Sequence, residues 1–495
     1  DAVSITLNII SFSLELDWDY LYIYDGEDFD APLIGEYTGD EIPDIITASG
    51  GSVLIEFRSD CNTNDDGWEI EWTSIEGDGE GDDLAPYTEV ILENDWYTMN
   101  FLTGFTDLDD TGGSGIDYKF YQVIDYNGVD WRANDNRGFF SDNFDDVIHP
   151  DWTNETGTWI ISDNTLQQTD EAIYNTNIHA ELNQDDADNF LYHWSGRMSG
   201  VGDNKRAGLH FMCDDPTLVN RGNSYFVWFR EDDDKIQIYK VVDDEFTLAI
   251  EADYTFSADT WYDFKTVYDK ISGEVHVWVN NMHAISWVDD SPYTEGNSVS
   301  FRSGSSVYNV NNFKVYHNRA VEELIAVGPA GDARYQNEDS YSPAAKIKSI
   351  VIDSASNVST IAEQLADIDW TPPLSIPYLN DGEAADISTT TSNTELEANW
   401  GAASDPNSGL ARYWYAIGTS AGATDVVDWT DNWYADTVIH TGLSLTLGET
   451  YYFAVMAENG AGLLSDTIYS NGQLLIEPTE EPISEFIAEH TNLCG

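Results

Sequence analysis

The sequence predicts an all-β protein built from several β-sandwich modules, and three observations support this. Short runs of alternating apolar and polar residues recur along the 495 residues, separated by turns rich in Asp and Gly. One stretch of sequence occurs twice, far apart in the chain. The first copy is interrupted by a strand-dense block, residues 139–318, that is long enough to be a domain of its own.

The composition favours folded modules in an unusually acidic protein. Hydrophobic residues make up 41% and aromatic residues 13% of the chain, whereas 20 Lys and Arg face 91 Asp and Glu, a net charge of −71. Such a surface repels nucleic acid and anionic membranes and attracts divalent cations. The charge can reflect a solvated acidic shell suited to a salty exterior, or several bound Ca²⁺ ions. We expect no nucleic-acid partner and no membrane insertion.

Cysteine usage and the chain ends give little structural information. Cys61, Cys213 and Cys494 are odd in number and far apart, so they indicate neither a disulfide framework nor a metal site. No apolar run approaches transmembrane length, and the first residues do not have the pattern of a signal peptide. We expect the chain to be a mature or excised piece of a longer protein.

The first module, residues 1–76, carries an ordered series of motifs. These are Asp17-Trp-Asp-Tyr-Leu-Tyr-Ile-Tyr-Asp-Gly26, Gly51-Ser-Val-Leu-Ile-Glu-Phe-Arg-Ser-Asp60 and Gly67-Trp-Glu-Ile-Glu-Trp72. Together they resemble a CUB domain. The resemblance covers the later two thirds of such a module, and the opening strands and usual disulfides of the family are missing. Either the module starts upstream, or a strand from a neighbouring chain completes its sheet.

This resemblance implies a calcium site. CUB domains of the calcium-binding type hold the ion with one Glu and two Asp, and the matching positions here are Glu15, Asp19 and Asp60, with Asn62 nearby. Converging carboxylates suit a hard cation, because Ca²⁺ takes several oxygen ligands. The other interpretation is that these acids lie in hydrated turns. An acidic, Gly-rich linker follows at residues 77–83.

The repeated stretch defines the next two modules. Ser114–Val123 matches Ser408–Ile417, so that Phe120 pairs with Trp414 and Tyr121 with Tyr415, and Trp131 then pairs with Trp429. The second copy continues directly into residues 445–459, whereas the counterpart of this continuation in the first copy is residues 346–357. We therefore predict a host domain made of residues 84–138 plus 319–368, which is interrupted by the block 139–318. A second domain follows at 369–476.

Both copies resemble fibronectin type III or Ig-like sandwiches. Trp400 lies where an early strand of that fold has its core Trp, and Leu445 and Tyr451 have the spacing of a tyrosine corner. Consecutive prolines at 372–373 mark the boundary between the copies. Residues 359–365 could form one short helix. Residues 477–495 form a linker or the start of a further module, with a possible short helix at 484–493.

The inserted block, residues 139–318, resembles a laminin-G or concanavalin-A-like jelly roll. The resemblance rests on Asp142-Asn-Phe, on Trp261-Tyr-Asp-Phe-Lys and on the hairpin Gly273-Glu-Val-His-Val-Trp-Val-Asn280. Asp142 and Asn312, near the ends of the block, could hold a structural Ca²⁺. Its many Trp and Tyr side chains could stack on sugar rings, although any one of them is expected to fill the core. The Trp candidates are Trp194, Trp228, Trp261, Trp278 and Trp287.

No catalytic constellation is apparent. Jelly-roll glycoside hydrolases place paired acids on one strand, and Glu274-Val-His276 offers a single acid. No Gly-x-Ser-x-Gly, His-Glu-x-x-His or phosphate loop occurs. The sequence therefore predicts a protein that is not an enzyme.

The leading hypothesis is a secreted, modular bacterial protein at the cell surface, stabilised by calcium and acting as an adhesin or filament subunit. Its lectin-like inserted domain would contact glycans, other cell-surface proteins or neighbouring copies. Two alternatives remain open. The chain could be a structural polymer subunit that assembles by strand complementation, or the accessory binding region of a larger secreted hydrolase.

Overall fold

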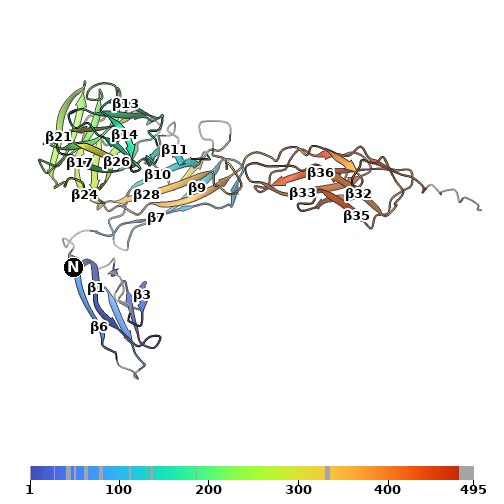
Figure 1. Ribbon diagram of the computed structural model, residues 1–495, viewed down its shortest axis with the longest axis horizontal. Helices are drawn as coiled ribbons and strands as arrows, with labels where there is room; N and C mark the ends of the chain where they lie inside the picture. Colours follow the sequence, from blue (N-terminus) through green and yellow to red (C-terminus); the bar gives the residue numbers. More distant parts are fainter. Residues whose placement is uncertain are drawn as a thin grey trace, which may run out of the picture.

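The computed structural model confirms an all-β, multi-domain fold (Figure 1). It describes residues 2–26, 28–29, 31–40, 46–48, 52–60, 65–76, 82–110, 113–126, 128–129, 131–133, 138–145, 147–184, 187–328 and 335–478. Every regular element among them is a β-strand. None of the described residues forms a helix with the length and hydropathy needed to span a bilayer. The possible helix at 484–493 lies outside the described residues.

The N-terminal module is a small sandwich of two three-stranded sheets, β4-β1-β6 and β3-β2-β5. In β2, Leu21 and Ile23 point into the core while their neighbours are partly exposed, as the two-residue period of a strand requires. Leu7, Ile9 and Phe12 of β1 face them from the other sheet. The strands are β1 (Ala2–Ser13), β2 (Tyr20–Tyr24), β3 (Leu33–Tyr37), β4 (Ile46–Ala48), β5 (Leu54–Arg58) and β6 (Gly67–Glu76).

The following module brings together strands from both sides of the inserted block. β10 pairs with β28 over most of its length, with Phe120 opposite Ile350. A three-stranded sheet, β27-β9-β7, packs on the sheet that contains β10, β28 and β29. The strands are β7 (Tyr87–Ile91), β8 (Trp96–Tyr97), β9 (Phe101–Leu108), β10 (Ile116–Tyr126), β11 (Trp131–Ala133), β27 (Glu322–Ile325), β28 (Ala345–Asp353) and β29 (Ala362–Ile368).

The prediction of a helix at 359–365 is wrong, because β29 occupies part of this segment. β29 pairs antiparallel with β28, and Ala366 and Ile368 at its end are buried in the core of the module. A helix of seven residues is marginal by itself. Pairing with the free edge of β28 satisfies the backbone of the segment and buries apolar surface as well.

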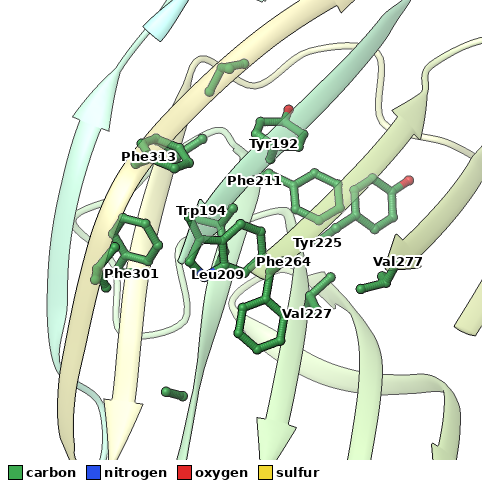
Figure 2. Close-up of a cluster of buried hydrophobic side chains, with 14 of the residues drawn as sticks. Tyr192, Trp194, Leu209, Phe211, Tyr225, Val227, Phe264, Val277, Phe301 and Phe313 are labelled. Atoms are coloured by element: carbon green, nitrogen blue, oxygen red, sulfur yellow. The ribbon is translucent and has the colours of Figure 1, made fainter. Parts of the chain in front are cut away.

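The inserted block is a sandwich of two large sheets around an aromatic core. Its first sheet has seven strands in the order β13-β16-β25-β18-β19-β20-β21, and its second runs β24-β23-β22-β17-β26. Figure 2 shows the core between them, where Trp194 lies close to Leu209 and Phe264, and all three are fully buried. Short strands β12 and β15 also pair with β26, and β14 pairs with β15.

The strands of the first sheet are β13 (Trp152–Thr156), β16 (Asn177–Glu181), β18 (Arg206–Cys213), β19 (Ser224–Arg230), β20 (Lys235–Val242), β21 (Glu245–Asp253) and β25 (Ser298–Gly304). The other strands of the block are β12 (Phe140–Asp142), β14 (Trp159–Ser162), β15 (Thr165–Gln168), β17 (Asn189–Ser199), β22 (Tyr262–Asp269), β23 (Glu274–Val279), β24 (Met282–Val288) and β26 (Val307–Asn318).

The second sheet of the inserted block continues into the sheet of the host module. β26 pairs with β10 through Phe120 opposite Asn318 and Tyr121 opposite His317. The outer face of the same sheet also contributes Val267 and Trp278 to an apolar cluster that includes Ile350 of β28. The two units are therefore joined by backbone pairing and by a shared core.

The last module repeats the arrangement of the host. β33 pairs with β36 as β10 pairs with β28, in a sheet ordered β31-β38-β36-β33-β34, and β30-β32-β35 form the facing sheet. Trp400 is buried in its core, and the Tyr451 hydroxyl accepts a hydrogen bond from the Thr446 amide at 2.7 Å. The strands are β30 (Leu379–Asp381), β31 (Thr389–Thr390), β32 (Glu395–Trp400), β33 (Leu410–Gly418), β34 (Val427–Asp431), β35 (Thr437–Thr441), β36 (Thr450–Asn459), β37 (Ile468–Tyr469) and β38 (Gln473–Leu475).

A buried arginine fixes the point where the chain leaves the inserted block. The side chain of Arg319, directly after β26, is fully buried and forms an ion pair with Asp107 of β9. Its guanidinium also donates to the hydroxyls of Ser349 at 2.8 Å and Thr88 at 3.1 Å, and it stacks on Phe105 at 4.0 Å. One side chain thus connects three strands of the host to the end of the block.

We predict that Arg319→Met destabilises the host module by about 3–5 kcal/mol, because it removes the fully buried cation of Asp107 and leaves that carboxylate with the partly exposed Lys119, 3.3 Å away. Denaturant unfolding monitored by tryptophan fluorescence measures the change. The control is Lys346→Met, which removes the partly exposed pair with Glu363 in the same module and should cost less than about 1 kcal/mol. Equal stability of the two variants would contradict this role for Arg319.

Candidate ligand-binding site

A pocket of about 320 Å³ lies on the outer face of the seven-stranded sheet, opposite the aromatic core. This volume is at the lower end of the roughly 300–1,000 Å³ typical of small-molecule sites. Only aromatic and arginine side chains line it: Tyr174, Arg206, Phe226, Trp228, Arg230, Tyr239, Phe246 and Arg302.

Strand alternation places these side chains on one face. In β19, Tyr225, Val227 and Phe229 belong to the core, so Phe226, Trp228 and Arg230 project to the opposite side. In the neighbouring strands Gly208 of β18 lies directly between Trp228 and Arg302 of β25. A Cβ at Gly208 would come within 1.9 Å of the Val227 carbonyl oxygen and 3.0 Å of the Phe226 ring. A glycine at this position therefore lets β18 pack closely against β19 beneath the pocket.

The arginines stack on the aromatic rings. The guanidinium carbons of Arg206 and Arg302 each lie 5.8 Å from the centre of the Trp228 ring, and Arg302 lies 5.0 Å from Phe246. Trp228 is 7% exposed, whereas Phe246 is 36% and Tyr174 61% exposed. The buried Trp thus forms the base of the pocket and the two other rings form an accessible rim.

Two of the three pocket arginines have no acidic partner in the described part of the chain. Arg302 is 8% exposed and donates to two neutral oxygens, Asn220 Oδ1 at 2.9 Å and the Val219 carbonyl at 3.4 Å. Arg206 contacts aromatic rings and lies directly opposite Arg230 in the sheet. Arg230 itself is paired with Asp233.

Burial and mutual repulsion act on these cations. Burial, and next the charge of Arg206, lower the pKa of Arg302 to about 10. Burial, and next the charge of Arg230, lower the pKa of Arg206. Beneath the pocket His210 stacks on Phe226 at 3.9 Å, and burial, followed by the charges of Arg221 and Arg302, holds its pKa well below the usual value. The pocket is therefore a local region of positive charge.

The predicted CUB-type calcium residues lie at one end of the N-terminal sandwich. Asp19 is 4% exposed, and its Oδ1 accepts the Asp60 amide at 3.2 Å. The Glu15 Oε2 atom is buried and has no hydrogen-bond partner among the described residues. Asn62 lies outside the described residues.

A tighter group of acids lies elsewhere. In the described residues, one group of three has ligand atoms within 4.8 Å of one another, and it consists of Asp82 at the end of the linker with Asp109 and Asp110 of the host module. Glu15, Asp19 and Asp60 do not reach this mutual distance.

The second predicted calcium pair is placed differently from what an ion site needs. Asp142 lies beside Phe313 in the β12–β26 pairing, and its carboxylate accepts the Phe144 amide and the Trp152 indole N–H, both at 2.9 Å. Arg132 lies 3.6 Å from the same carboxylate. Asn312 is exposed, with φ of 52°. Protein donors thus already engage both oxygens of Asp142.

Sequence reasoning named Trp228 as an aromatic candidate and missed the arginines. Trp194 and Trp278 are 0% and 1% exposed, as expected for core residues, and Trp261 is 38% exposed. One of these arginines could have been found from the alternation in β19, which puts Arg230 on the same face of the strand as Trp228. The positions of Arg206 and Arg302 depend on pairing between distant strands, which the local pattern does not contain.

Comparison with known proteins confirms the nature of the N-terminal module. Residues 1–72 match the model of the CUB domain family. The chain is 34% identical over 73 residues to Putative protein tag-53 of Caenorhabditis elegans, covering 15% of this chain and 6% of that protein. It is 35% identical over 65 residues to Cubilin of Homo sapiens, covering 13% and 2%. The chain spans only a small part of the length of these relatives.

Among solved structures, similar chains match about a third of this protein. The carbohydrate binding module CBM66 from Bacillus subtilis is 15% identical with a TM-score of 0.28, covering 33% of this chain and 93% of that chain. The galectin LEC-6 of Caenorhabditis elegans is 12% identical with a TM-score of 0.23, covering 30% and 96%. The metal-free carbohydrate recognition domain of Emp46p is 13% identical with a TM-score of 0.30, covering 37% and 97%.

Proposed function

We propose that the protein is a non-catalytic extracellular binding protein whose inserted module holds a glycan in the pocket above Trp228. The observation that carries this proposal is the combination of aromatic faces with guanidinium donors in one pocket of about 320 Å³. Apolar C–H faces of a sugar ring pack on aromatic rings, and Arg offers five N–H donors to its hydroxyl oxygens. Such a site is typical of lectin-like recognition at a cell surface.

The lining supports binding without catalysis. None of the eight residues that line the pocket is a carboxylate, Ser, Cys or His. Glycoside hydrolysis by the usual mechanism needs two carboxyl groups about 5–10 Å apart across the scissile bond. This pocket can orient and hold a sugar, and it offers no pair of groups to cleave one.

Calcium stabilisation of the CUB module belongs to the same proposal. The buried and unpartnered Oε2 atom of Glu15 fits a cation, because an ionised oxygen without a donor is costly to bury. Asp19, nearly fully buried, can supply a second carboxylate close to the Asp60 amide. A bound Ca²⁺ would supply the missing charge at this end of the sandwich.

A second candidate function is assembly into a polymer through the CUB module. Each of its two sheets has three described strands, and an apolar groove of about 500 Å³ runs along Ile5, Val53, Trp68 and Trp72. Trp72 is 66% exposed in this groove. A strand from a second copy of the chain would cover it and extend a sheet.

For the glycan pocket, we predict that Tyr174→Ala and Phe246→Ala each weaken binding about two- to tenfold, the loss expected for one aromatic contact. A glycan array with the full chain identifies the ligand, and calorimetry measures its affinity for each variant. Trp433→Ala, which removes an equally exposed ring from the last module, should bind normally. Absence of any glycan ligand, or unchanged affinity in both rim variants, would contradict the proposal.

For the calcium site, we predict that millimolar Ca²⁺ raises the melting temperature of the CUB module in the presence of 0.15 M NaCl. Glu15→Gln should remove most of this shift, because it withdraws one charged ligand. Glu36→Gln, an exposed carboxylate of the same module, is the matched control and should retain it. An equal shift in both variants would indicate general charge screening and sink the site.

For assembly, we predict concentration-dependent oligomers that disappear in Trp72→Lys and on deletion of residues 1–76. Light scattering coupled to size-exclusion chromatography detects them. Trp18→Lys places the same charge at another exposed Trp of the module, outside the groove, and should assemble normally. A monomer at all concentrations would rule out this second function.

A further inference from the structure

We infer that the glycan held in this pocket is anionic, with a carboxylate or sulfate group of the sugar bound between Arg206 and Arg302 above Trp228. This inference rests on the proposed glycan-binding function and names its ligand class. It is carried by the charge, partners and register of these two arginines.

The pocket gathers three of the few cations of this acidic chain. The protein has 20 Lys and Arg against 91 Asp and Glu, yet three arginines and no acid line this one pocket. Arg319 and Arg412 have the acidic partners Asp107 and Asp431, whereas Arg197 and Arg221 have none among the described residues. What distinguishes this pocket is that two arginines without an acidic partner face the same cavity.

The pocket arginines repel one another, which raises the free energy of this arrangement. Arg206 and Arg230 are directly opposite in neighbouring antiparallel strands, where like charges destabilise a sheet. Arg302 is nearly fully buried, its partners are neutral, and its Nε atom has no hydrogen-bond partner. Asp233 forms its ion pair with Arg230, and its charge acts on Arg206 only at longer range. An anion placed between Arg206 and Arg302 would relieve the repulsion and satisfy the open donors.

The positions of the arginines and of the aromatic rings set the shape that the ligand must have. Arg206 and Arg302 lie at the same distance, 5.8 Å, from the ring of Trp228, and Gly208 separates Trp228 from Arg302 in the register of the sheet. A planar guanidinium binds carboxylate or sulfate oxygens through two parallel N–H groups. The accessible rings of Phe246 and Tyr174 offer apolar faces beside this position. A ring with one apolar face and an acidic substituent, such as a uronic acid or a sulfated sugar, matches both.

The surface of the rest of the protein is strongly acidic, and this limits the charge density that the ligand can have. A net charge of −71 repels anions at a distance, but at physiological salt this field is screened beyond a Debye length of about 8 Å. A ligand inside the pocket would be in direct contact with guanidiniums and with no carboxylate of the lining. The ligand should be an oligosaccharide with separated charges and not a dense polyanion, which would meet the acidic surface around the pocket.

The test compares three ligands on the full chain: a neutral oligosaccharide that ends in one galacturonate, the methyl ester of that galacturonate, and the same oligosaccharide ending in one sulfated galactose. We expect one acidic form to bind about 10- to 100-fold more tightly than the ester, the range for hydrogen bonds to a charged group. Carboxylate and sulfate ligands are distinguished by which arm binds. Arg206→Gln should abolish this difference, and Arg206→Lys should restore part of it. Circular dichroism verifies that the variants are folded.

The matched control is Arg197→Gln. Arg197 belongs to β17 in the other sheet of the block, and its guanidinium carbon lies 4.9 Å from the centre of the Trp261 ring. This variant should preserve the preference for the acidic form. Binding of both the carboxylate and the sulfate form no tighter than that of the ester would overturn the inference and leave the glycan function standing, whereas no binding of any glycan would overturn both. Binding of a poly-glutamate peptide as tight as that of the acidic sugar would also overturn it, because the pocket would then recognise charge without the sugar.

Discussion

The arrangement of the molecule depends on the backbone pairing of β10, which has neighbours on both sides. β28 pairs with it on one edge, and the end of β26 pairs with it beside Phe120 and Tyr121 on the other. This pairing makes one sheet of the inserted block continuous with a sheet of the host module. The other sheet of the block is thereby held on the far side of the aromatic core. The pocket on its outer face points away from the host and is open to a ligand.

The same strand explains how a long insertion is tolerated. Closing a loop of this length costs little additional entropy, but an inserted domain attached by two flexible ends would reorient freely. Here the shared sheet, the apolar cluster around Trp278 and Ile350, and the buried Arg319 hold both ends of the block. A rigid connection suits a protein that presents a binding face at a distance from its other modules.

The sequence supported the fold further than the site, for a physical reason. Two-residue alternation and motif order are local, and they predicted the strands, the CUB module and the burial of Trp194. The helix expected at 359–365 failed because the free edge of β28 stabilises a strand there, a tertiary effect absent from the local pattern. The pocket depends on a register that brings Gly208, Trp228 and Arg302 into one row, and single-strand patterns carry no information on register. The calcium sites and the fibronectin-like resemblance remain predictions.

Under the proposed function, the rigidity of the sheet would make binding in the pocket selective. In β19, the residues that flank Trp228 on the other face, Val227 and Phe229, are packed in the core, so the strand cannot shift without disrupting it. A ligand would therefore meet guanidiniums that are already ordered, and little side-chain entropy would be lost on binding. Ring contacts hold both guanidiniums on this face, Arg206 against Tyr174 and Trp228 and Arg302 against Trp228 and Phe246. Under the proposed function, an anion is the group that would best stabilise two like charges held together in this way.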